Sequence, residues 1–172
     1  MLDLLPDICD LWPQECHLLP LAFKQYGGRK IFYGEVVTVK CFEDNSRVKE
    51  LLATPGAGRI LLVDGAGSCR RALLGDLIAA SAANHGWAGV VINGAVRDVG
   101  TLATIDLGVQ ALGAVPFKTE RKGVGETQID VDMGGITVSP GMYLYADSNG
   151  ILVTNRALDL SQLADFQPSC LT

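Results

Sequence analysis

Short apolar runs and an amphipathic segment alternate through the middle of the chain. Residues 59–67 (RILLVDGAG) and 88–94 (AGVVING) are continuous apolar runs that end in glycine turns, which is typical of buried strands. Between them, residues 73–86 end at Gly86 and have apolar positions at helical spacing, namely Leu73, Leu74, Leu77 and Ile78. A strand, a helix and a second strand in this order predict a βαβ unit with parallel strands.

The segments before this unit predict a short helix, a long strand and another short helix. The first helix extends to about Glu15 and is broken at Pro13. Residues 26–42 follow a glycine turn and are rich in β-branched and aromatic residues, which favours a strand. A short helix is predicted over residues 45–58, with Pro55-Gly56 as its end. It can be capped by either of two side chains, Asn45 or Ser46.

The segments after the unit predict a mixed sheet. A short helix over residues 99–108 leads into a strand over 109–117, and residues 127–154 read as strands joined by turns, with a hairpin turn over 147–150. A closing helix is predicted over residues 157–166. The predicted fold class is α/β, with a mixed sheet around a central βαβ unit and one domain over residues 1–172.

Composition and charge exclude several classes of protein. With 48% hydrophobic residues the chain is not disordered, and this high share favours a buried contact between subunits. The net charge of −5 argues against direct binding of nucleic acid, which needs a basic surface. No apolar run is long enough to span a membrane. The acidic N-terminus is not a secretory signal, and five cysteines without a CxxC pair indicate reduced thiols in the cytoplasm.

Two polar segments are expected to meet at one edge of the sheet. The helix that starts near Asp76 advances about 15 Å over roughly ten residues, and the strand that follows it returns by roughly 16 Å. Because these lengths nearly cancel, the helix start at Gly75-Asp76 should lie beside Arg97-Asp98. This is the carboxyl edge, where open α/β sheets usually bind ligands.

The residue types at this edge suit a small 2-oxo acid. The helix start can bind a carboxylate through its dipole and its free N–H groups, which belong to Gly75, Asp76, Leu77 and Ile78. Arg97 can donate to a polarised keto oxygen. Asp98 and Asp76 are hard oxygen ligands suited to Mg²⁺ or Mn²⁺, directly or through water. Taken singly, Asp76 also fits a helix N-cap and Arg97-Asp98 a surface ion pair, so these residues alone leave both interpretations open.

The spacing of these residues resembles a known motif. Asp76, twenty residues and then Arg97-Asp98 is similar to the Asp-x20-Arg-Asp signature of the class II 4-hydroxy-4-methyl-2-oxoglutarate aldolases. The surrounding segment GRILLVDGAGSCRRALLGDLIAASAANHGWAGVVINGAVRD resembles the superfamily that these aldolases share with the regulator of ribonuclease activity A (RraA-like). The resemblance extends over nearly the whole chain and includes YGGRKIFYGEVVTVKCFEDN and LYADSNGILV.

The resemblance implies a fold, an assembly and a reaction. The fold would be a compact α/β/β sandwich of the swivelling-domain type, assembled as a ring-shaped homotrimer with active sites near the subunit interfaces. The reaction would be cleavage of 4-hydroxy-4-methyl-2-oxoglutarate to two pyruvates, with oxaloacetate decarboxylation as a side activity through the same pyruvate enolate. By position, the residues that bind the pyruvyl part are Gly75, Asp76, Leu77, Ile78 and Arg97.

The resemblance also implies a divalent metal cation, Mg²⁺ or Mn²⁺, as cofactor. Asp98 would bind the metal, and Asp76 would support it through water. Arg97 and Asp76 are the predicted catalytic residues: Arg97 stabilises the enolate, and Asp76 orders a water as the best available base.

Two other functions compete with the aldolase. The overall sequence resembles the ribonuclease-regulator branch more closely. The alternative function is therefore that of a regulator without enzymatic activity, which binds an endoribonuclease. That branch has glutamine after the arginine, and Asp98 at this position favours the enzyme. The segment LLVDGAGSC also resembles a nucleotide or S-adenosylmethionine turn, but Arg70 stands in place of the third glycine of GxGxxG.

Overall fold

A mixed β-sheet runs through the middle of the protein. The computed structural model describes residues 1–164. The strands, in chain order, are β1 (His17–Leu18), β2 (Lys24–Gln25), β3 (Phe32–Lys40), β4 (Ile60–Asp64), β5 (Ala72–Leu74), β6 (Gly89–Val96), β7 (Gly108–Ala114), β8 (Glu126–Thr127), β9 (Val131–Asp132), β10 (Thr137–Val138), β11 (Tyr143–Asp147) and β12 (Gly150–Thr154). The sheet order is β1-β12-β11-β3-β4-β6-β7-β2, with β5 paired to β6 and β8 to β3, while β9 and β10 form a separate pair.

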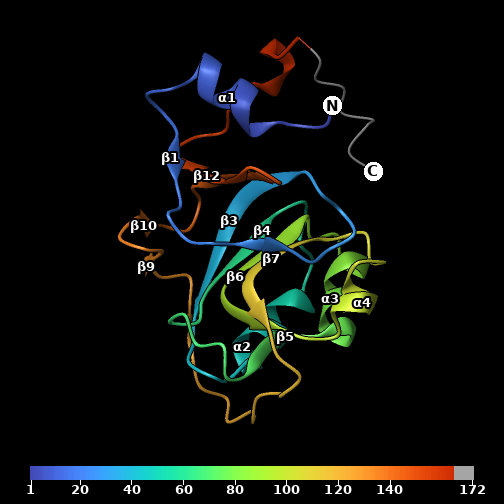
Figure 1. Ribbon diagram of the computed structural model, residues 1–172. Helices are drawn as coiled ribbons and strands as arrows, with labels where there is room; N and C mark the ends of the chain where they lie inside the picture. The colour runs from blue at the N-terminus through green and yellow to red at the C-terminus, as the bar shows by residue number, and fades with distance from the viewer. Residues whose placement is uncertain (165–172) are drawn as a thin grey trace.

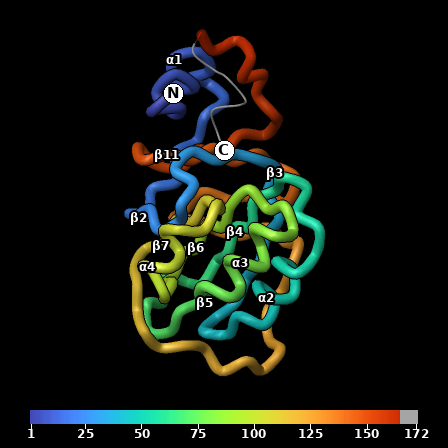
Figure 2. The backbone as a smooth tube through the Cα atoms, turned by 90° about the vertical axis from the view of Figure 1, so that its right-hand side faces the viewer, coloured from blue at the N-terminus to red at the C-terminus, as the bar shows by residue number. Residues whose placement is uncertain are grey.

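The helices lie in two places around this sheet. Figures 1 and 2 show α2 (Ser46–Leu52), α3 (Asp76–Asn84) and α4 (Val99–Leu102) together on one side of the parallel strands. At the opposite end of the molecule, α1 (Leu5–Leu11) and the 3₁₀ turn η1 (Leu160–Gln162) pack against β11 and β12. Within residues 1–164, no helix has both the length and the apolar character needed to cross a membrane.

Both faces of the central strands are buried, which explains their continuous apolar sequences. In β4, Leu61 and Val63 pack in the cluster under α2 and α3, whereas Ile60 and Leu62 pack in the cluster on the other face, with β9 to β12. All four side chains are fully buried. Successive residues of a strand point to opposite faces, so burial on both faces removes the usual alternation with polar residues.

The predicted α/β class and the central βαβ unit are confirmed. Strands β3, β4, β6 and β7 pair in parallel, and α3 connects β4 with β6 by way of β5. Strand β11 pairs antiparallel with β3 and with β12, so the sheet is mixed. The predicted hairpin turn is also present, because Asp147 at the end of β11 pairs with Gly150 at the start of β12.

The start predicted for the central helix is wrong. Leu73 and Leu74 belong to β5, and the helix begins only at Asp76. Both leucines are buried in the core under α2 and α3, but they reach it from a strand. Gly75 has an extended backbone, with φ −132° and ψ −174°, and separates the strand from the helix. Leu77, which the helical spacing placed on the apolar face, is 81% exposed.

Several other element boundaries differ from the predictions. The first helix ends at Leu11, before Pro13, and the helix predicted over 99–108 is the four-residue α4. The closing helix predicted over 157–166 is only the 3₁₀ turn η1, and its last two residues lie outside the described part of the chain. Asn45 is the N-cap residue of α2, but its side chain makes no capping hydrogen bond. The backbone N–H of Ser46 donates instead to Oδ1 of Asp44 at 2.8 Å.

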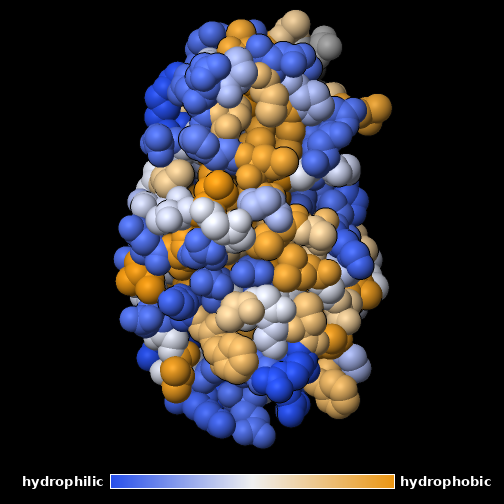
Figure 3. Space-filling model, turned by 60° about the vertical axis from the view of Figure 1, so that its left-hand side comes forward, coloured by the Kyte–Doolittle hydropathy of each residue, from blue (hydrophilic) through white to orange (hydrophobic). Residues whose placement is uncertain are grey.

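Apolar side chains also reach the surface. Figure 3 shows hydrophobic patches between polar areas on one face of the molecule. Among the described residues, the large hydrophobic side chains that are more than half exposed are Leu2, Leu18, Phe42, Leu77, Phe117 and Val124.

Candidate functional site

Strand β5 brings the two predicted polar segments together. It pairs in parallel with the last residues of β6, with Ala72 opposite Ala95 and Leu74 opposite Val96. The two strands therefore end side by side, and there the N–H of Arg97 donates to the carbonyl of Leu74 at 2.9 Å. Because the strands are parallel, the residues that follow them lie side by side at the carboxyl edge of the sheet.

Asp98 lies between Arg97 and the start of α3. Its Oδ2 is 3.2 Å from Nε of Arg97 and 3.4 Å from the backbone nitrogen of Asp76. The side chains of Arg97 and Asp98 are each 36% exposed, so water and small ligands reach them. The backbone of Asp98 is left-handed, with φ +55°, and the residue precedes α4 without capping it. Residues other than glycine in this backbone region cluster at functional sites.

The start of α3 presents backbone N–H donors, and carboxylates contact two of them, those of Asp76 and Leu77. Gly75 is the N-cap residue and has no side chain to cover them. The interpretation of Asp76 as N-cap is therefore wrong, although its Oδ1 does accept from the N–H of Leu77 at 2.8 Å. A Cβ added at Gly75 would lie 2.6 Å from Oδ2 of Asp98 and 3.2 Å from Nε of Arg97. Any larger residue would displace these two side chains.

These groups open into a cavity of about 360 Å³. Of the predicted residues, its lining includes Gly75, Asp76, Leu77, Ile78 and Arg97. Asp98 is not part of the lining and is reached through its contacts with two lining residues. The structure thus brings all the predicted residues together, while their roles stay predictions.

The remaining wall of the cavity was not predicted from the sequence. It consists of Asn45, Ala72, Lys118, Thr119, Glu120 and Arg121. The segment that follows β7 is attached to the start of β5, where the N–H of Ala72 donates to the carbonyl of Phe117 at 2.8 Å. The charge-rich run KTERK over 118–122 is the only local signal for this wall, and nothing in it indicates a partner across the sheet edge.

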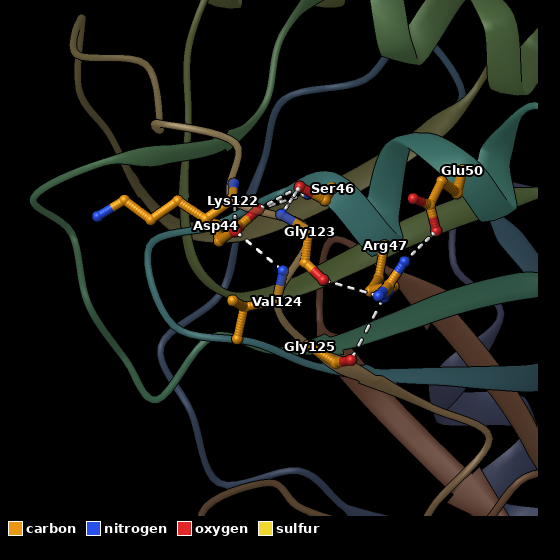
Figure 4. Close-up of polar contacts among 8 residues, drawn as sticks. All are labelled: Asp44, Ser46, Arg47, Glu50, Lys122, Gly123, Val124 and Gly125. Carbon is orange, nitrogen blue, oxygen red and sulfur yellow. Dashed lines mark hydrogen bonds and ion pairs between the residues drawn. The ribbon is translucent and has the colours of Figure 1, made fainter.

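A buried carboxylate holds the residues that directly follow this segment, as Figure 4 shows. Asp44 is 4% exposed. Its Oδ1 accepts from the backbone N–H and from the hydroxyl of Ser46, and its Oδ2 accepts from the N–H groups of Lys122 and Val124 at 2.8 and 3.2 Å. Arg47 adds hydrogen bonds to two carbonyl oxygens of the same segment. Asp44 therefore fastens residues 122–124 to the start of α2.

This network predicts a contribution of Asp44 to stability that depends on pH. Burial by itself raises the pKa of the Asp44 carboxyl, but hydrogen bonds from Ser46, Lys122 and Val124 outweigh it and lower the pKa from 3.8 to about 2. A carboxyl with a lowered pKa in the folded state stabilises the fold above pH 4, and this contribution is lost as the pH falls towards 2. At pH 7 it amounts to about 2 kcal/mol.

Denaturant unfolding of the Asp44→Asn variant measures this contribution. The variant is expected to lose about 2 kcal/mol of unfolding free energy at pH 7 relative to the wild type, and clearly less at pH 3. Asp159→Asn is the matched control, because Asp159 also accepts from a neighbouring serine but is exposed. An equal loss at both pH values would contradict the prediction.

The side chains at the cavity fit a magnesium-type ion better than a closed metal site. Among residues 1–164, no group of three or more His, Cys, Asp or Glu side chains is placed to hold a metal. Mg²⁺ is commonly held by one or two carboxylates and completes its coordination with water and substrate oxygens. Asp98, with Asp76 next to it, offers such a donor set. The residues therefore fit a hydrated divalent cation.

The glycine turn after β4 does not have the geometry of a nucleotide site. The N–H groups of Gly65 and Gly67 both donate to the carbonyl of Asn93 at 3.1 Å. The turn leads into strand β5, so no helix N-terminus follows it directly. In a dinucleotide site, by contrast, the N–H groups of the glycine turn are free, and a helix that starts directly after the turn faces the phosphates.

Fold and site together define an α/β protein with a charged pocket at the carboxyl edge of its parallel strands. The chain belongs to the RraA-like family, whose model, described as Aldolase/RraA, matches residues 5–153. A protein of Shewanella oneidensis named "Putative 4-hydroxy-4-methyl-2-oxoglutarate aldolase" is 57% identical over 163 residues, which cover 95% of this chain and 99% of the relative. A protein of the same name from Photobacterium profundum is 53% identical and covers 95% and 100%.

Two solved structures share this fold closely. The RNA-processing inhibitor RraA from Thermus thermophilis has a TM-score of 0.88 and 42% identity, over 94% of this chain and 98% of that one. A protein from Geobacillus kaustophilus, named S-adenosylmethionine:2-dimethylmenaquinone methyltransferase, has a TM-score of 0.88 and 41% identity, over 91% and 97%. The predicted family and the predicted RraA-like fold are confirmed.

Proposed function

We propose that this protein is a divalent-metal-dependent aldolase that cleaves 4-hydroxy-4-methyl-2-oxoglutarate to two pyruvates and also decarboxylates oxaloacetate. The observation that carries the proposal is the position of Asp98, whose Oδ2 lies within 3.4 Å of both Arg97 Nε and the N–H of Asp76 beside one cavity. The names of the curated relatives support the aldolase reaction.

Different residues bind the substrate, stabilise the developing charge and remove the proton. The start of α3 is assigned to the carboxylate of the pyruvyl part, because its first residues line the cavity and its N-cap residue Gly75 has no capping side chain. Arg97 donates to the 2-keto oxygen and stabilises the negative charge that this oxygen acquires when the C3–C4 bond breaks. Asp76 orders the water that removes the proton of the C4 hydroxyl, which leaves the second pyruvate as a ketone.

Asp98 would hold the divalent cation, with Asp76 supporting it through water. When bound, the cation supplies Lewis-acid polarisation of the 2-keto group. The electron pair of the broken C3–C4 bond then forms pyruvate enolate, and protonation of its C3 gives the first pyruvate. Oxaloacetate loses CO₂ by breaking the same bond, so both substrates depend on Arg97 in the same way.

Metal removal tests this function directly. Purified protein is expected to form pyruvate from both substrates with Mg²⁺ or Mn²⁺ present, and turnover is expected to fall to the uncatalysed rate in EDTA and to return when Mg²⁺ is added in excess. Pyruvate is measured with a coupled dehydrogenase, with the coupling enzyme checked separately in EDTA. A folded, Mg²⁺-loaded protein that turns over neither substrate would refute the proposal.

The second candidate function is regulation of an endoribonuclease without catalysis. It is favoured by the 42% identity with the RNA-processing inhibitor from Thermus thermophilis. The two candidates differ at the cavity, since a protein that only binds a partner does not require Asp98 beside Arg97. A methyltransferase reaction, the activity in the name of the Geobacillus kaustophilus protein, is disfavoured because Gly65 and Gly67 already donate to Asn93.

The predicted homotrimer, the cytoplasmic location and the single domain over residues 1–172 stay predictions. The exposed Leu77, at the rim of the cavity, supports a subunit contact near the site. The mass of the protein in solution, measured by light scattering, tests the assembly.

A further inference from the structure

The wall of the cavity that faces α3 carries two cations without an acidic partner. Within residues 1–164, neither Lys118 nor Arg121 forms an ion pair, whereas the neighbouring Lys122 pairs with Glu120 at 3.8 Å. Both Lys118 and Arg121 line the same cavity as Gly75 and Arg97, and they belong to the segment that follows β7. Unpaired positive charge in a polar cavity favours an anionic ligand group at that position.

Arg121 is oriented by a buried amide. Asn45 is 6% exposed, and its Oδ1 accepts from Nε of Arg121 at 3.1 Å and from the hydroxyl of Thr119 at 2.7 Å. On its other side, Nδ2 of Asn45 donates to the carbonyl of Leu73 at 3.2 Å, two residues before Gly75. Asn45 therefore joins the Arg121 wall to the strand that leads into the pyruvyl-binding start of α3.

This arrangement leaves the outer edge of the guanidinium available. Nε of Arg121 is engaged by Asn45, and the two terminal nitrogens have no hydrogen-bond partner among the described residues. The fork of a guanidinium matches the two oxygens of a carboxylate, and an arginine held in advance loses less conformational freedom on binding. The cavity of about 360 Å³ has room for a small dicarboxylate between the two walls.

We propose that Arg121 binds the second carboxylate of the substrate, with Asn45 as its positioning residue, so that the site selects 2-oxo dicarboxylates over 2-oxo monocarboxylates. This inference rests on the proposed function, because it takes the pyruvyl end to lie at Gly75 and Arg97. It assigns recognition of the far half of the substrate to the segment that follows β7.

A binding experiment with two ligands of equal chain length tests the inference. With Mg²⁺ present, calorimetry compares 2-oxoglutarate with 2-oxopentanoate, which lacks the second carboxylate. The wild type is expected to bind 2-oxoglutarate about 10-fold or more tightly. Arg121→Ala is expected to abolish this preference and to leave the affinity for 2-oxopentanoate within about twofold.

Lys122→Ala is the matched control. Lys122 is the adjacent cation on the same segment, but it does not line the cavity, and Figure 4 shows its ammonium extending away from Asp44. This variant is expected to keep the preference for 2-oxoglutarate. For the positioning role, Asn45→Ala should lose the preference while keeping its affinity for 2-oxopentanoate within about twofold, because Nε of Arg121 then has no acceptor and the pyruvyl-binding groups are unchanged.

The outcomes separate this inference from the proposed function. Equal binding of the two ligands by the wild type, or a preference that survives in Arg121→Ala, would overturn the inference. A preference that depends on Arg121, in a protein that forms no pyruvate from 4-hydroxy-4-methyl-2-oxoglutarate, would support the inference and refute the aldolase.

Discussion

Replacing Asp98 by asparagine is expected to lower kcat/KM for pyruvate formation by about 10³-fold, with both substrates. The amide has the size of the carboxylate but no charge, so it holds a divalent cation poorly. Asparagine also tolerates the left-handed backbone that Asp98 adopts at φ +55°, so the fold should be unaffected. The measurement is steady-state kinetics together with the thermal midpoint of unfolding.

The binding of Mn²⁺ separates loss of the metal from loss of structure. Asp98→Asn is expected to weaken Mn²⁺ binding in a spectroscopic titration while its thermal midpoint stays near that of the wild type. Asp130→Asn is the control, because it removes the same charge from an exposed position outside the cavity. Wild-type turnover by Asp98→Asn would show that this carboxylate is not the metal ligand.

Replacing Gly75 by alanine is expected to lower kcat/KM by about 10²-fold without unfolding the protein. The added methyl would lie 2.6 Å from Oδ2 of Asp98, closer than these atoms can approach, and 3.2 Å from Nε of Arg97. The backbone of Gly75, at φ −132°, is open to any residue, so the strain falls on the two side chains. Both must move away from the start of α3, which misplaces the groups that act on the substrate.

Gly100→Ala is the control for Gly75→Ala. Gly100 lies in α4, two residues after Asp98, and no atom lies within 4 Å of a Cβ added there. This variant should keep wild-type kinetics and unfold at the same temperature or slightly higher, because alanine favours a helix. If both glycine variants kept full activity, the close approach at Gly75 would have no part in catalysis.

The sequence by itself determined the α/β class, the parallel central strands and the residues at one edge of the sheet. The strands β4 and β6 are continuous apolar runs, which are typical of parallel strands buried on both faces. The chain connects them through one helix, so its start and the end of β6 had to return to the same edge. This local geometry is enough to place Gly75-Asp76 beside Arg97-Asp98, and the structure has them in contact.

Only the tertiary structure decided the start of α3 and the far wall of the cavity. Leu73 and Leu74 suit a helix or a strand equally well by pattern, and pairing with β6 makes them a strand. Asn45 and Arg121 lie 76 residues apart in the sequence and share a hydrogen bond in the cavity wall. Asp44 likewise reaches Lys122 and Val124 from the start of α2. Such contacts depend on how separate elements pack, so the spacing of residues along the chain does not predict them.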